Sequence, residues 1–228
     1  MERGLYIAAS GMIAEQVRQN QISNDLANAS TPGYKADRSS QRSFGDMLLQ
    51  NSVTGQVVGP IGEGVTIAKT VTDLTSAPVR STGEPLDFAI EGQGFFELQT
   101  PQGIRYTRDG QFMRSAKGTL TDSLGNSVLG QNGRPITVKA DGTANSTPGV
   151  FNVTNPKKIG DSMFSGRGTG KATGTVQSGA LESSGTDPAE AMIDMITSER
   201  SYEAGQKAIH TIDETLQKAV SSVPSLSG

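Results

Sequence analysis

Both ends of the chain carry the pattern of a long amphipathic helix, and the residues between them do not. The second helix is predicted to begin at Asp187-Pro188-Ala189-Glu190, where a capping carboxylate precedes a first-turn proline and a glutamate lies three residues after the cap. Apolar side chains then recur every seven residues, at Met195, Tyr202, Ile209, Leu216 and Val223. A flanking set follows the same stretch, at Met192, Ile196, Ile212 and Val220. At 1.5 Å rise per residue, this pattern predicts a rod of about 50 Å.

The first helix is predicted from the amino terminus to about residue 29. Leu5, Met12 and Leu26 share one heptad position, while Ala8 and Ile22 share the companion position. Such a narrow stripe is typical of a coiled-coil-like seam rather than of a helix buried in a globular core. Proline and glycine in the turn that follows should end the helix. The residues of this turn that we single out are Asn28, Thr31, Pro32, Gly33 and Tyr34.

The middle of the chain has the short alternating runs and the turn signals of β-structure. The strand-like runs are VTIAKTV (65–71), DFAIE (87–91), GFFELQT (94–100), IRYTRDG (104–110), GTLTD (118–122), SVLGQ (127–131) and PITVKADG (135–142). The sequence therefore predicts an α+β fold, in which N- and C-terminal long helices form a coiled-coil-like pair beside a central, mostly antiparallel β domain.

Three parts follow from this division. Residues 1–35 together with 183–228 would form a helical core domain, and residues 36–64 an extended connector with one helical patch around 44–49. Residues 65–182 would form a β-rich outer domain that ends in a mobile Gly-rich loop at 155–182.

Composition argues against several functional classes. Hydrophobic residues make up 34% of the 228 residues and aromatic residues 5%, which is low for a compact enzyme of this length. The 20 basic and 23 acidic residues form no basic stripe, so we predict no nucleic-acid partner. The chain has no cysteine and one histidine, His210, which argues against a thiolate nucleophile and a zinc site.

The remaining candidates for chemistry are weak. The segment SGRGTGKATG (165–174) resembles a phosphate-binding loop, but Ala172 stands where the magnesium-binding hydroxyl would be required. Asp87, Glu91, Glu97 and Asp109 could pair as glycosidase carboxylates, although surface or turn carboxylates are the simpler interpretation. We therefore predict no catalytic residue, cofactor, metal or small-molecule substrate.

The amino terminus lacks the continuous apolar stretch of a cleavable secretory signal. No run of about 18 apolar residues is present, so no transmembrane helix is predicted. If the protein leaves the cytoplasm, we expect export without the usual signal peptide.

Three sequence blocks, taken in order, resemble the flagellar axial proteins, which are the rod, hook and hook-associated subunits. They are GLYIAASGM (4–12) with SNDLANASTPGYKADR (23–38), the block AIEGQGFFELQTPQGIRYTRDGQFMRSAKGTLTDSLGNSVLG (89–130), and SGALESSGTDPAEAMIDMITSERSYEAGQKAIHTIDETLQKAV (178–220). The length and the single small β domain are most similar to the flagellar basal-body rod proteins. QVVGPIGEGV (56–65) resembles the distal-rod type and DPAEAMIDMI (187–196) its proximal-rod relative, so both types stay open.

The resemblance implies a non-enzymatic structural subunit that polymerises into a hollow helical tube and carries motor torque across the periplasm to the hook. The terminal helices would line the tube and the β domain would face outward. The implied partners are further copies of the chain, other rod and hook proteins, the flagellar type III export apparatus and, as a further candidate, the ring proteins around the rod.

The residues expected at subunit interfaces are the apolar ones of the helical seams. They are Leu5, Met12, Ile22, Leu26, Met192, Met195, Ile196, Tyr202, Ile209 and Leu216. Ile13, Val17, Ile193 and Ile212 lie off the main seam, and contacts with further copies would cover them as well. The alternatives are a pair of helices that merely caps a β domain in a monomer, a secreted or surface binding protein with a helical stalk, and a peptidoglycan hydrolase.

Overall fold

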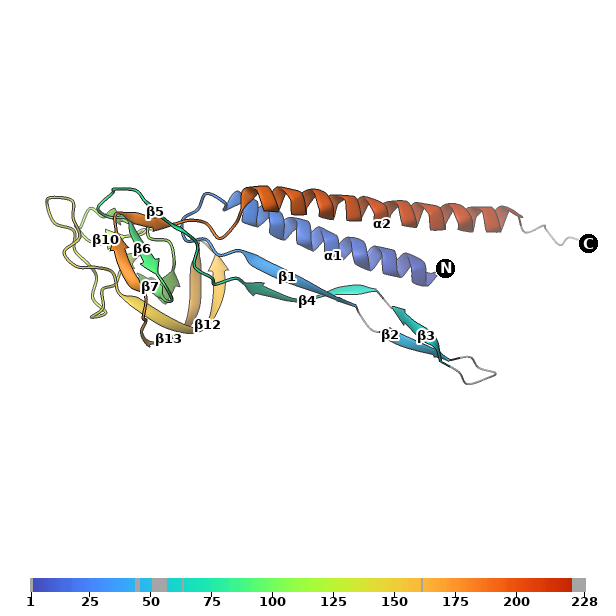
Figure 1. The fold of residues 1–228 in the computed structure, drawn as a ribbon, viewed down its shortest axis with the longest axis horizontal. Coiled ribbons are helices and arrows are strands. Elements are labelled where there is room, and N and C mark those ends of the chain that lie inside the picture. The colour runs from blue at the N-terminus through green and yellow to red at the C-terminus, as the bar shows by residue number, and fades with distance from the viewer. Residues whose placement is uncertain (1, 44–45, 51–56, 63, 161, 223–228) are drawn as a thin grey trace, which may run out of the picture. The chain divides into compact units, whose positions relative to one another are not determined.

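The computed structural model describes residues 2–43, 46–50, 57–62, 64–160 and 162–222 (Figure 1). Its contacts divide the chain into two units. Unit 1 takes its residues from 1–26, 37–71 and 188–228, and unit 2 comprises residues 27–36 and 72–187. The chain thus shows two terminal helices and a central antiparallel β region, as the α+β prediction expects.

Unit 1 contains the two helices and four strands. The helices are α1 (Glu2–Ala27) and α2 (Pro188–Ser222), and α2 begins at the proline that the capping pattern marks as its first residue. The strands are β1 (Asp37–Ser43), β2 (Asp46–Gln50), β3 (Val57–Gly62) and β4 (Val65–Thr72). They form two ribbons, in which β1 pairs with β4 and β2 pairs with β3.

The prediction of a helical patch at 44–49 is wrong for residues 46–49, which belong to strand β2. Residues 44 and 45 lie outside the described residues. Met47 and Leu48 lie opposite Ile61 and Pro60 in the antiparallel ladder. A run of five residues with adjacent apolar side chains fits a short strand as well as a helical turn. Pairing with β3 therefore decides the structure here, and local periodicity does not.

Unit 2 is built around a seven-stranded sheet with the strand order β12-β13-β8-β7-β11-β10-β9. Its strands are β7 (Phe95–Thr100), β8 (Gly103–Thr107), β9 (Met113–Arg114), β10 (Leu120–Thr121), β11 (Ser127–Val128), β12 (Val150–Gly160) and β13 (Met163–Lys171). Two further ribbons pair β6 (Phe88–Glu91) with β14 (Thr175–Ser178), and β5 (Val79–Ser81) with β15 (Ala180–Glu182). Every pairing whose register is described in this unit is antiparallel.

The core of unit 2 gathers most of the aromatic side chains of the middle segment. Phe96 packs edge-on against Phe112 with their ring centroids 5.4 Å apart, and Phe88 lies 6.2 Å from Phe112. A second small cluster holds Phe95 against Phe164 at 5.3 Å. Because these rings are almost fully buried, the unit has a hydrophobic core of its own.

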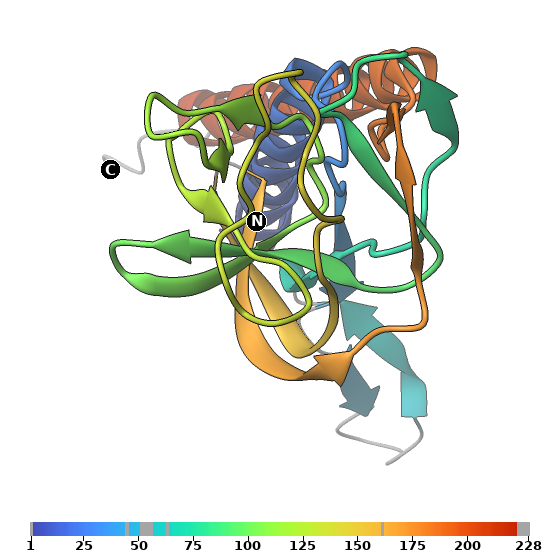
Figure 2. The same ribbon diagram turned by 90° about the vertical axis from the view of Figure 1, so that its left-hand side faces the viewer.

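The segment predicted as a mobile Gly-rich loop at 155–182 is instead mostly β-structure, and this corrects the prediction. It contains the end of β12 and the whole of β13, β14 and β15 (Figure 2, where β12 and β13 form the long yellow-orange ribbon). A Cβ on Gly166 would lie 2.3 Å from the Val153 side chain, and one on Gly168 would lie 2.5 Å from the Tyr106 hydroxyl. These glycines make room for neighbouring side chains within a sheet, a role that composition alone does not distinguish from flexibility.

Candidate functional site

The two helices of unit 1 lie side by side and run antiparallel (Figure 1). The Ser198 hydroxyl donates to the Glu15 carboxylate at 2.6 Å, and Arg18 lies 3.6 Å from Asp194 in an exposed ion pair. Further along, a Cβ on Gly205 would lie only 2.7 Å from the Met12 side chain. The small residues of α2 therefore let α1 approach closely at these positions.

On each helix one set of buried or half-buried residues follows alternating spacings of three and four. On α2 they are Ala191, Met195, Ser198, Tyr202, Gly205, Ile209, Ile212 and Leu216, and on α1 they are Ala8, Met12, Glu15, Gln19, Ile22 and Leu26. This spacing keeps one line of each helix facing its neighbour. About half of the positions hold small or polar side chains, so the pair buries little apolar surface.

The predicted interface residues divide between this line and the open surface. Ile22 is buried, while Met12, Leu26, Met195, Tyr202, Ile209 and Leu216 are half-buried. Leu5, Met192 and Ile196 are exposed. The periodicity of the sequence identifies the half-buried line of both helices, but it does not separate that line from the exposed apolar residues beside it.

A second face of α1 contacts the strands of unit 1. The Ser10 hydroxyl accepts a hydrogen bond from the Val65 amide at 3.2 Å, and the Gln21 side-chain amide donates to the Asp37 carbonyl. Ala14 and Asp25 are buried on this side of the helix. Polar side chains on this second face of α1 thus satisfy backbone groups of β1 and β4.

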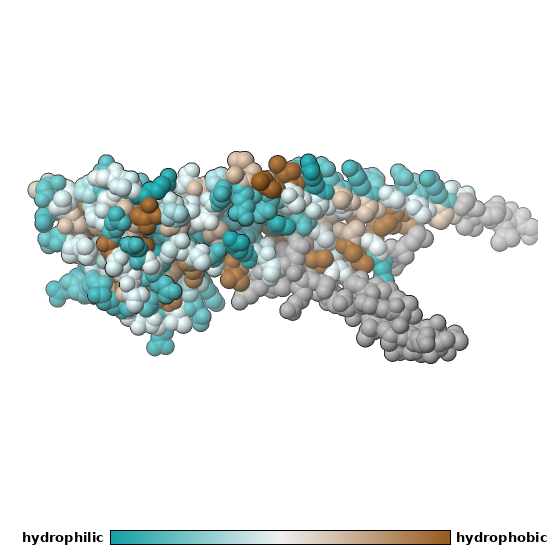
Figure 3. Space-filling model, viewed as in Figure 1, coloured by the Kyte–Doolittle hydropathy of each residue, from teal (hydrophilic) through white to brown (hydrophobic). Residues whose placement is uncertain are grey.

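An apolar surface remains uncovered on the two helices. Met192, Ile193 and Ile196 are 53%, 65% and 51% exposed and share one face of α2, because they lie three and four residues apart. Ile13 and Val17 form a similar pair on α1, at 63% and 42% exposure. Figure 3 shows a brown patch over the first turns of α2. Contiguous exposed apolar side chains of this kind mark protein-binding surfaces.

The turn after α1 belongs to unit 2, where it is held by hydrogen bonds to the segment that precedes α2. The Gly33 amide donates to the Glu182 carbonyl at 2.9 Å, and the Gly185 amide donates to the Tyr34 carbonyl at 2.8 Å. Asn28 accepts from the Ser184 hydroxyl at 3.0 Å and from the Thr31 amide at the same distance. Pro32 lies inside this turn and contributes no amide donor. The predicted turn residues therefore fasten two segments that are about 150 residues apart in the sequence.

Gly33 is required in this turn for two reasons. Its φ of 63° is a left-handed conformation that favours glycine. A Cβ at this position would also lie 2.2 Å from the Arg108 carbonyl oxygen. The turn consequently packs directly on the backbone that follows β8.

Beneath the turn lies a buried cluster of three charges, which we call the junction cluster: Lys35, Arg108 and Glu182. The Lys35 ammonium donates to Glu182 Oε1 at 2.7 Å, and the Arg108 guanidinium donates to Glu182 Oε2 at 3.1 Å. Lys35 also reaches the Thr75 carbonyl, and Arg108 reaches the Gly92 carbonyl at 2.8 Å. Burial lowers the pKa of the Lys35 ammonium, and the Glu182 carboxylate opposes that shift.

The junction cluster was not predicted from the sequence. Its members are separated by 147 and 74 positions, and no local pattern marks any of them as buried. The Lys158 ammonium adds a further tie, because it donates to the Lys35 carbonyl at 2.8 Å and lies 3.9 Å from the centre of the Tyr34 ring. The junction cluster and Lys158 together thus link the turn to β15, to the residue after β8 and to β12.

The carboxylates considered for catalysis do not all lie at one place, because Asp87 and Asp109 line one hollow of unit 2 that Glu91 and Glu97 do not line. Glu97 lies opposite Tyr106 in the β7–β8 ladder, and burial raises the pKa of its carboxyl. Asp109 has a pKa raised to about 6, chiefly by burial and further by Asp122 and Asp87. Glu91 lies exposed at the end of β6. Among the described residues, no group of three potential ligands could hold a metal ion.

The structure also places His210 and the 165–174 segment, the other two candidates for chemistry in the sequence. His210 is exposed on α2, and most of the segment is strand β13 rather than a loop before a helix. None of the helices in the described residues is both long and apolar enough to span a membrane.

Comparison with known proteins gives matches along most of the chain. Residues 5–35 match the family model described as flagella basal body rod protein, and residues 89–169 match the flagellar hook protein FlgE/F/G D1 domain. Residues 177–222 match the flagellar basal body rod FlgEFG protein C-terminal. The three matches follow the order of the three blocks identified in the sequence.

Whole-chain relatives agree with these matches. The chain is 30% identical to the flagellar hook-basal body complex protein FlhO of Bacillus subtilis, over 98% of this chain and 99% of the relative. It is 31% identical to the flagellar basal-body rod protein FlgG of the same organism, over 96% and 98% of the two chains. It is 32% identical to FlgG of Borreliella burgdorferi, over 95% and 97%. Similarity at this level over nearly the full length of both proteins shows that the chain belongs to the flagellar basal-body rod protein family.

Proposed function

We propose that this chain is a structural subunit of the flagellar basal-body rod, which assembles through its helices and performs no catalysis. The names of its relatives support a rod protein. The observation that carries the physical argument is the exposed apolar face of Met192, Ile193 and Ile196 on a helix that already contacts α1. A helix pair with a second apolar face left open can bury it only against another chain.

The assembled form that we propose is a hollow helical tube that transmits motor torque across the periplasm to the hook. Residues 1–35 with 183–228 would form the helical layer through coiled-coil-like pairing, 36–64 the connector and 65–182 the outer layer. Other rod and hook proteins would continue the tube at its ends, and the ring proteins would surround it. Export would use the flagellar type III apparatus without a cleavable signal peptide.

Both sets of predicted interface residues have a place in this proposal. The half-buried line of Met12, Leu26, Met195, Tyr202, Ile209 and Leu216 would hold the pair together and pack on neighbouring pairs. Leu5, Met192 and Ile196, which are exposed in the single chain, would contact other copies. Each apolar side chain buried in this way contributes about 1.5–3 kcal/mol, so a repeated lattice of contacts would resist torsion.

The test is polymerisation of the full-length chain, compared between Ile193→Asp and the matched control Gln206→Asp on an exposed site of the same helix. Sedimentation and negative-stain microscopy would give the protein concentration above which polymers form. We expect Ile193→Asp to raise that concentration at least tenfold, because a charge would replace a buried apolar contact, and Gln206→Asp to change it less than twofold. Circular dichroism of the monomers should be the same for both variants. A wild-type chain that stays monomeric at all concentrations, or an Ile193→Asp chain that polymerises normally, would contradict the proposal.

A further inference from the structure

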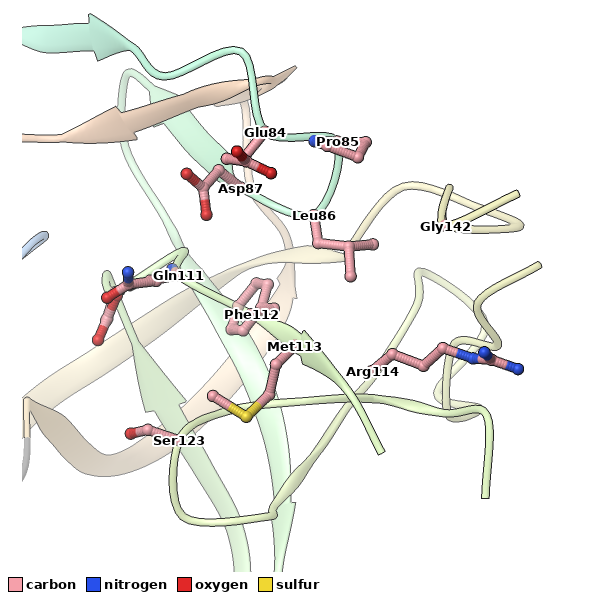
Figure 4. Close-up of a pocket in the computed structure, with 11 residues that line it drawn as sticks. Glu84, Pro85, Leu86, Asp87, Gln111, Phe112, Met113, Arg114, Ser123 and Gly142 are labelled. Atoms are coloured by element: carbon pink, nitrogen blue, oxygen red, sulfur yellow. Dashed lines mark hydrogen bonds between the residues drawn. The ribbon is translucent and has the colours of Figure 1, made fainter. Parts of the chain in front are cut away.

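Unit 2 contains an acidic hollow that the assembly of the helices does not use. Its volume is about 440 Å³, and its acidic lining residues are Glu84, Asp87 and Asp109. Figure 4 shows the carboxylates of Glu84 and Asp87 on one side of the hollow, with Leu86, Phe112 and Met113 beside them. We call this feature the acidic hollow.

Asp87 is the group in the acidic hollow that most clearly lacks a partner. It is only 7% exposed, and in the described part of the chain neither a hydrogen bond nor an ion pair reaches its carboxylate. The Asp87 oxygens are not among the fully enclosed, unpartnered side-chain atoms of the described residues, so they open into the hollow. A carboxylate that faces a hollow without a partner of its own is available to a ligand from outside the unit.

The surroundings of Asp87 point to a positively charged ligand. Burial and the carboxylates of Asp122 and Asp87 together raise the pKa of Asp109, and an incoming cation would relieve this repulsion. Arg114 is the basic residue that lines the hollow, and in Figure 4 its guanidinium points away from Glu84 and Asp87. The apolar side chains next to the carboxylates suit the aliphatic stem of a lysine or arginine.

The same unit carries exposed cations of the required kind on a different surface. Strands β12 and β13 contain Lys157, Lys158, Arg167 and Lys171 and no acidic residue. Lys157 and Arg167 are exposed, line a shallow hollow of about 850 Å³ and have no ion-pair partner among the described residues. The two hollows share no lining residue, so both could be occupied at once.

We propose that the acidic hollow of one copy receives Arg167 or Lys157 from the β12–β13 hairpin of a second copy. The occupant is inferred from charge, since among the described residues the Asp87 carboxylate has no hydrogen bond or ion pair, and the exposed Lys157 and Arg167 have no ion-pair partner. A contact between two different surfaces of identical chains does not close on itself as a two-fold dimer does, and it propagates in rings or filaments. This inference rests on the proposed function, because it supplies a contact of unit 2 within the same assembly.

The test is a charge-exchange cycle in the full-length chain, with the polymerisation threshold measured by sedimentation at low and at high salt. Glu84→Lys is the hollow variant, because Glu84 is exposed and its replacement should not disturb the core, and Arg167→Glu is the hairpin variant. We expect each one alone to raise the threshold about tenfold at low salt, and the double variant to return it to within about twofold of wild type. High salt should reduce all of these differences, because it screens charges at an interface.

Two matched controls test whether position matters or only net charge. Glu91→Lys and Arg134→Glu make the same changes at exposed sites of unit 2 outside both hollows. We expect neither to shift the threshold more than twofold. If single variants weaken assembly but the double variant does not restore it, the acidic hollow does not bind this hairpin and the proposal is wrong.

Failure of this inference can be told apart from failure of the proposed function. Suppose that wild type polymerises and Ile193→Asp does not, while the charge variants behave like wild type. The helical assembly then stands, and the contact between the acidic hollow of one copy and the hairpin of another is rejected. If wild type never polymerises, both are rejected. Asp87→Asn tests the hollow from inside, because it removes the unpartnered charge. We expect it to raise the polymerisation threshold and to reduce the salt dependence of that threshold.

Discussion

The two units of this protein differ in how their chains are held. In unit 2 the core residues Phe96, Leu98, Leu120 and Val128 are at most 1% exposed, and the junction cluster is buried beside them. In unit 1, by contrast, Ala191 and Ser198 are the only buried residues among 188–221 of α2. A long helix with so little burial does not offset the conformational entropy of ordering it. Unit 2 therefore has the contacts of a self-sufficient domain, whereas α2 of unit 1 leaves most of its described surface open.

Because unit 2 is held by its own buried contacts, we expect its stability to be most sensitive to a change in the buried charges of the junction cluster. Glu182→Gln would leave Lys35 and Arg108 buried opposite a neutral amide. We expect a loss of about 3–5 kcal/mol in the free energy of unfolding, because breaking a buried ion cluster leaves uncompensated charge. Hydrogen exchange of peptides from β6 to β8 would measure it, with Glu203→Gln on the exposed face of α2 as the control. A loss below about 1 kcal/mol would contradict the role of the cluster.

The turn over the cluster gives the next largest expected effect. Gly33→Ala must adopt a left-handed φ and place its Cβ against the Arg108 carbonyl, whereas Gly83→Ala has φ of 76° and no atom within 4 Å of its Cβ. We expect Gly33→Ala to destabilise unit 2 by about 2–3 kcal/mol and Gly83→Ala by about 1 kcal/mol, which is the backbone cost alone. Denaturant unfolding of both variants would measure the difference. Equal effects would mean that the turn does not pack on the strand end as described.

Asp109 should show that one charge in unit 2 is destabilising. Its pKa is about 6 in the folded chain against an ordinary value of 3.8, so the folded state binds more protons between these values. Stability contributed by this group is therefore lost as the pH rises from about 4 to 6. Asp109→Asn should raise the free energy of unfolding by up to about 2 kcal/mol at pH 7.5 and by little at pH 4.

The matched control for Asp109 is an aspartate whose pKa is shifted the other way. Hydrogen bonds from Thr143 lower the pKa of Asp141, which lies in an exposed turn. Asp141→Asn should therefore not stabilise the protein at pH 7.5. Denaturant unfolding at the two pH values would measure both variants, and stabilisation by both would show that net charge, rather than the site of Asp109, is responsible.

The smallest expected effect distinguishes buried from exposed isoleucines on α1. Ile22 is 8% exposed and Ile13 is 63% exposed in the single chain. We expect Ile22→Ala to cost about 1–2 kcal/mol in the local stability of the monomer and Ile13→Ala less than 0.5 kcal/mol. Hydrogen exchange of α1 peptides in the monomer and in the polymer would measure both. In the polymer Ile13→Ala should become the costlier change if that face is covered, and equal costs in both states would contradict this.

Local signals in the sequence were enough to predict the two helices and several of the strands. The capping pattern at Asp187 and Pro188 marks the start of α2, and the seven-residue spacing of Met195, Tyr202, Ile209 and Leu216 matches its half-buried line. The run at 94–100 contains β7 and the run at 65–71 lies within β4. Each of these depends on neighbours in the sequence, so one chain is enough to identify it.

The features that depend on distant residues were missed or misassigned. Lys35 and Glu182 are buried because the turn after α1 contacts the end of β15. No pattern in the residues that flank either position in the sequence predicts this contact. Gly166 and Gly168 fit the sheet because Val153 and Tyr106 fill the space above them. The run at 135–142 forms isolated bridges, such as Thr119 with Thr137, rather than a continuous strand. In each case the deciding partner lies elsewhere in the chain.

The hydrogen bonds from Gly33 to Glu182 and from Gly185 to Tyr34 bring together the segment by which the chain first enters unit 2 and the segment by which it finally leaves it. A domain whose ends meet in this way behaves as an insertion within another structure, and its interior can be lengthened or shortened without moving its ends. The alignment with the FlhO relative spans 268 positions against 228 residues here, so at least 40 positions are gaps in this chain. Ends fastened in this way would allow unit 2 to change in length between relatives while the two helices that flank it are kept.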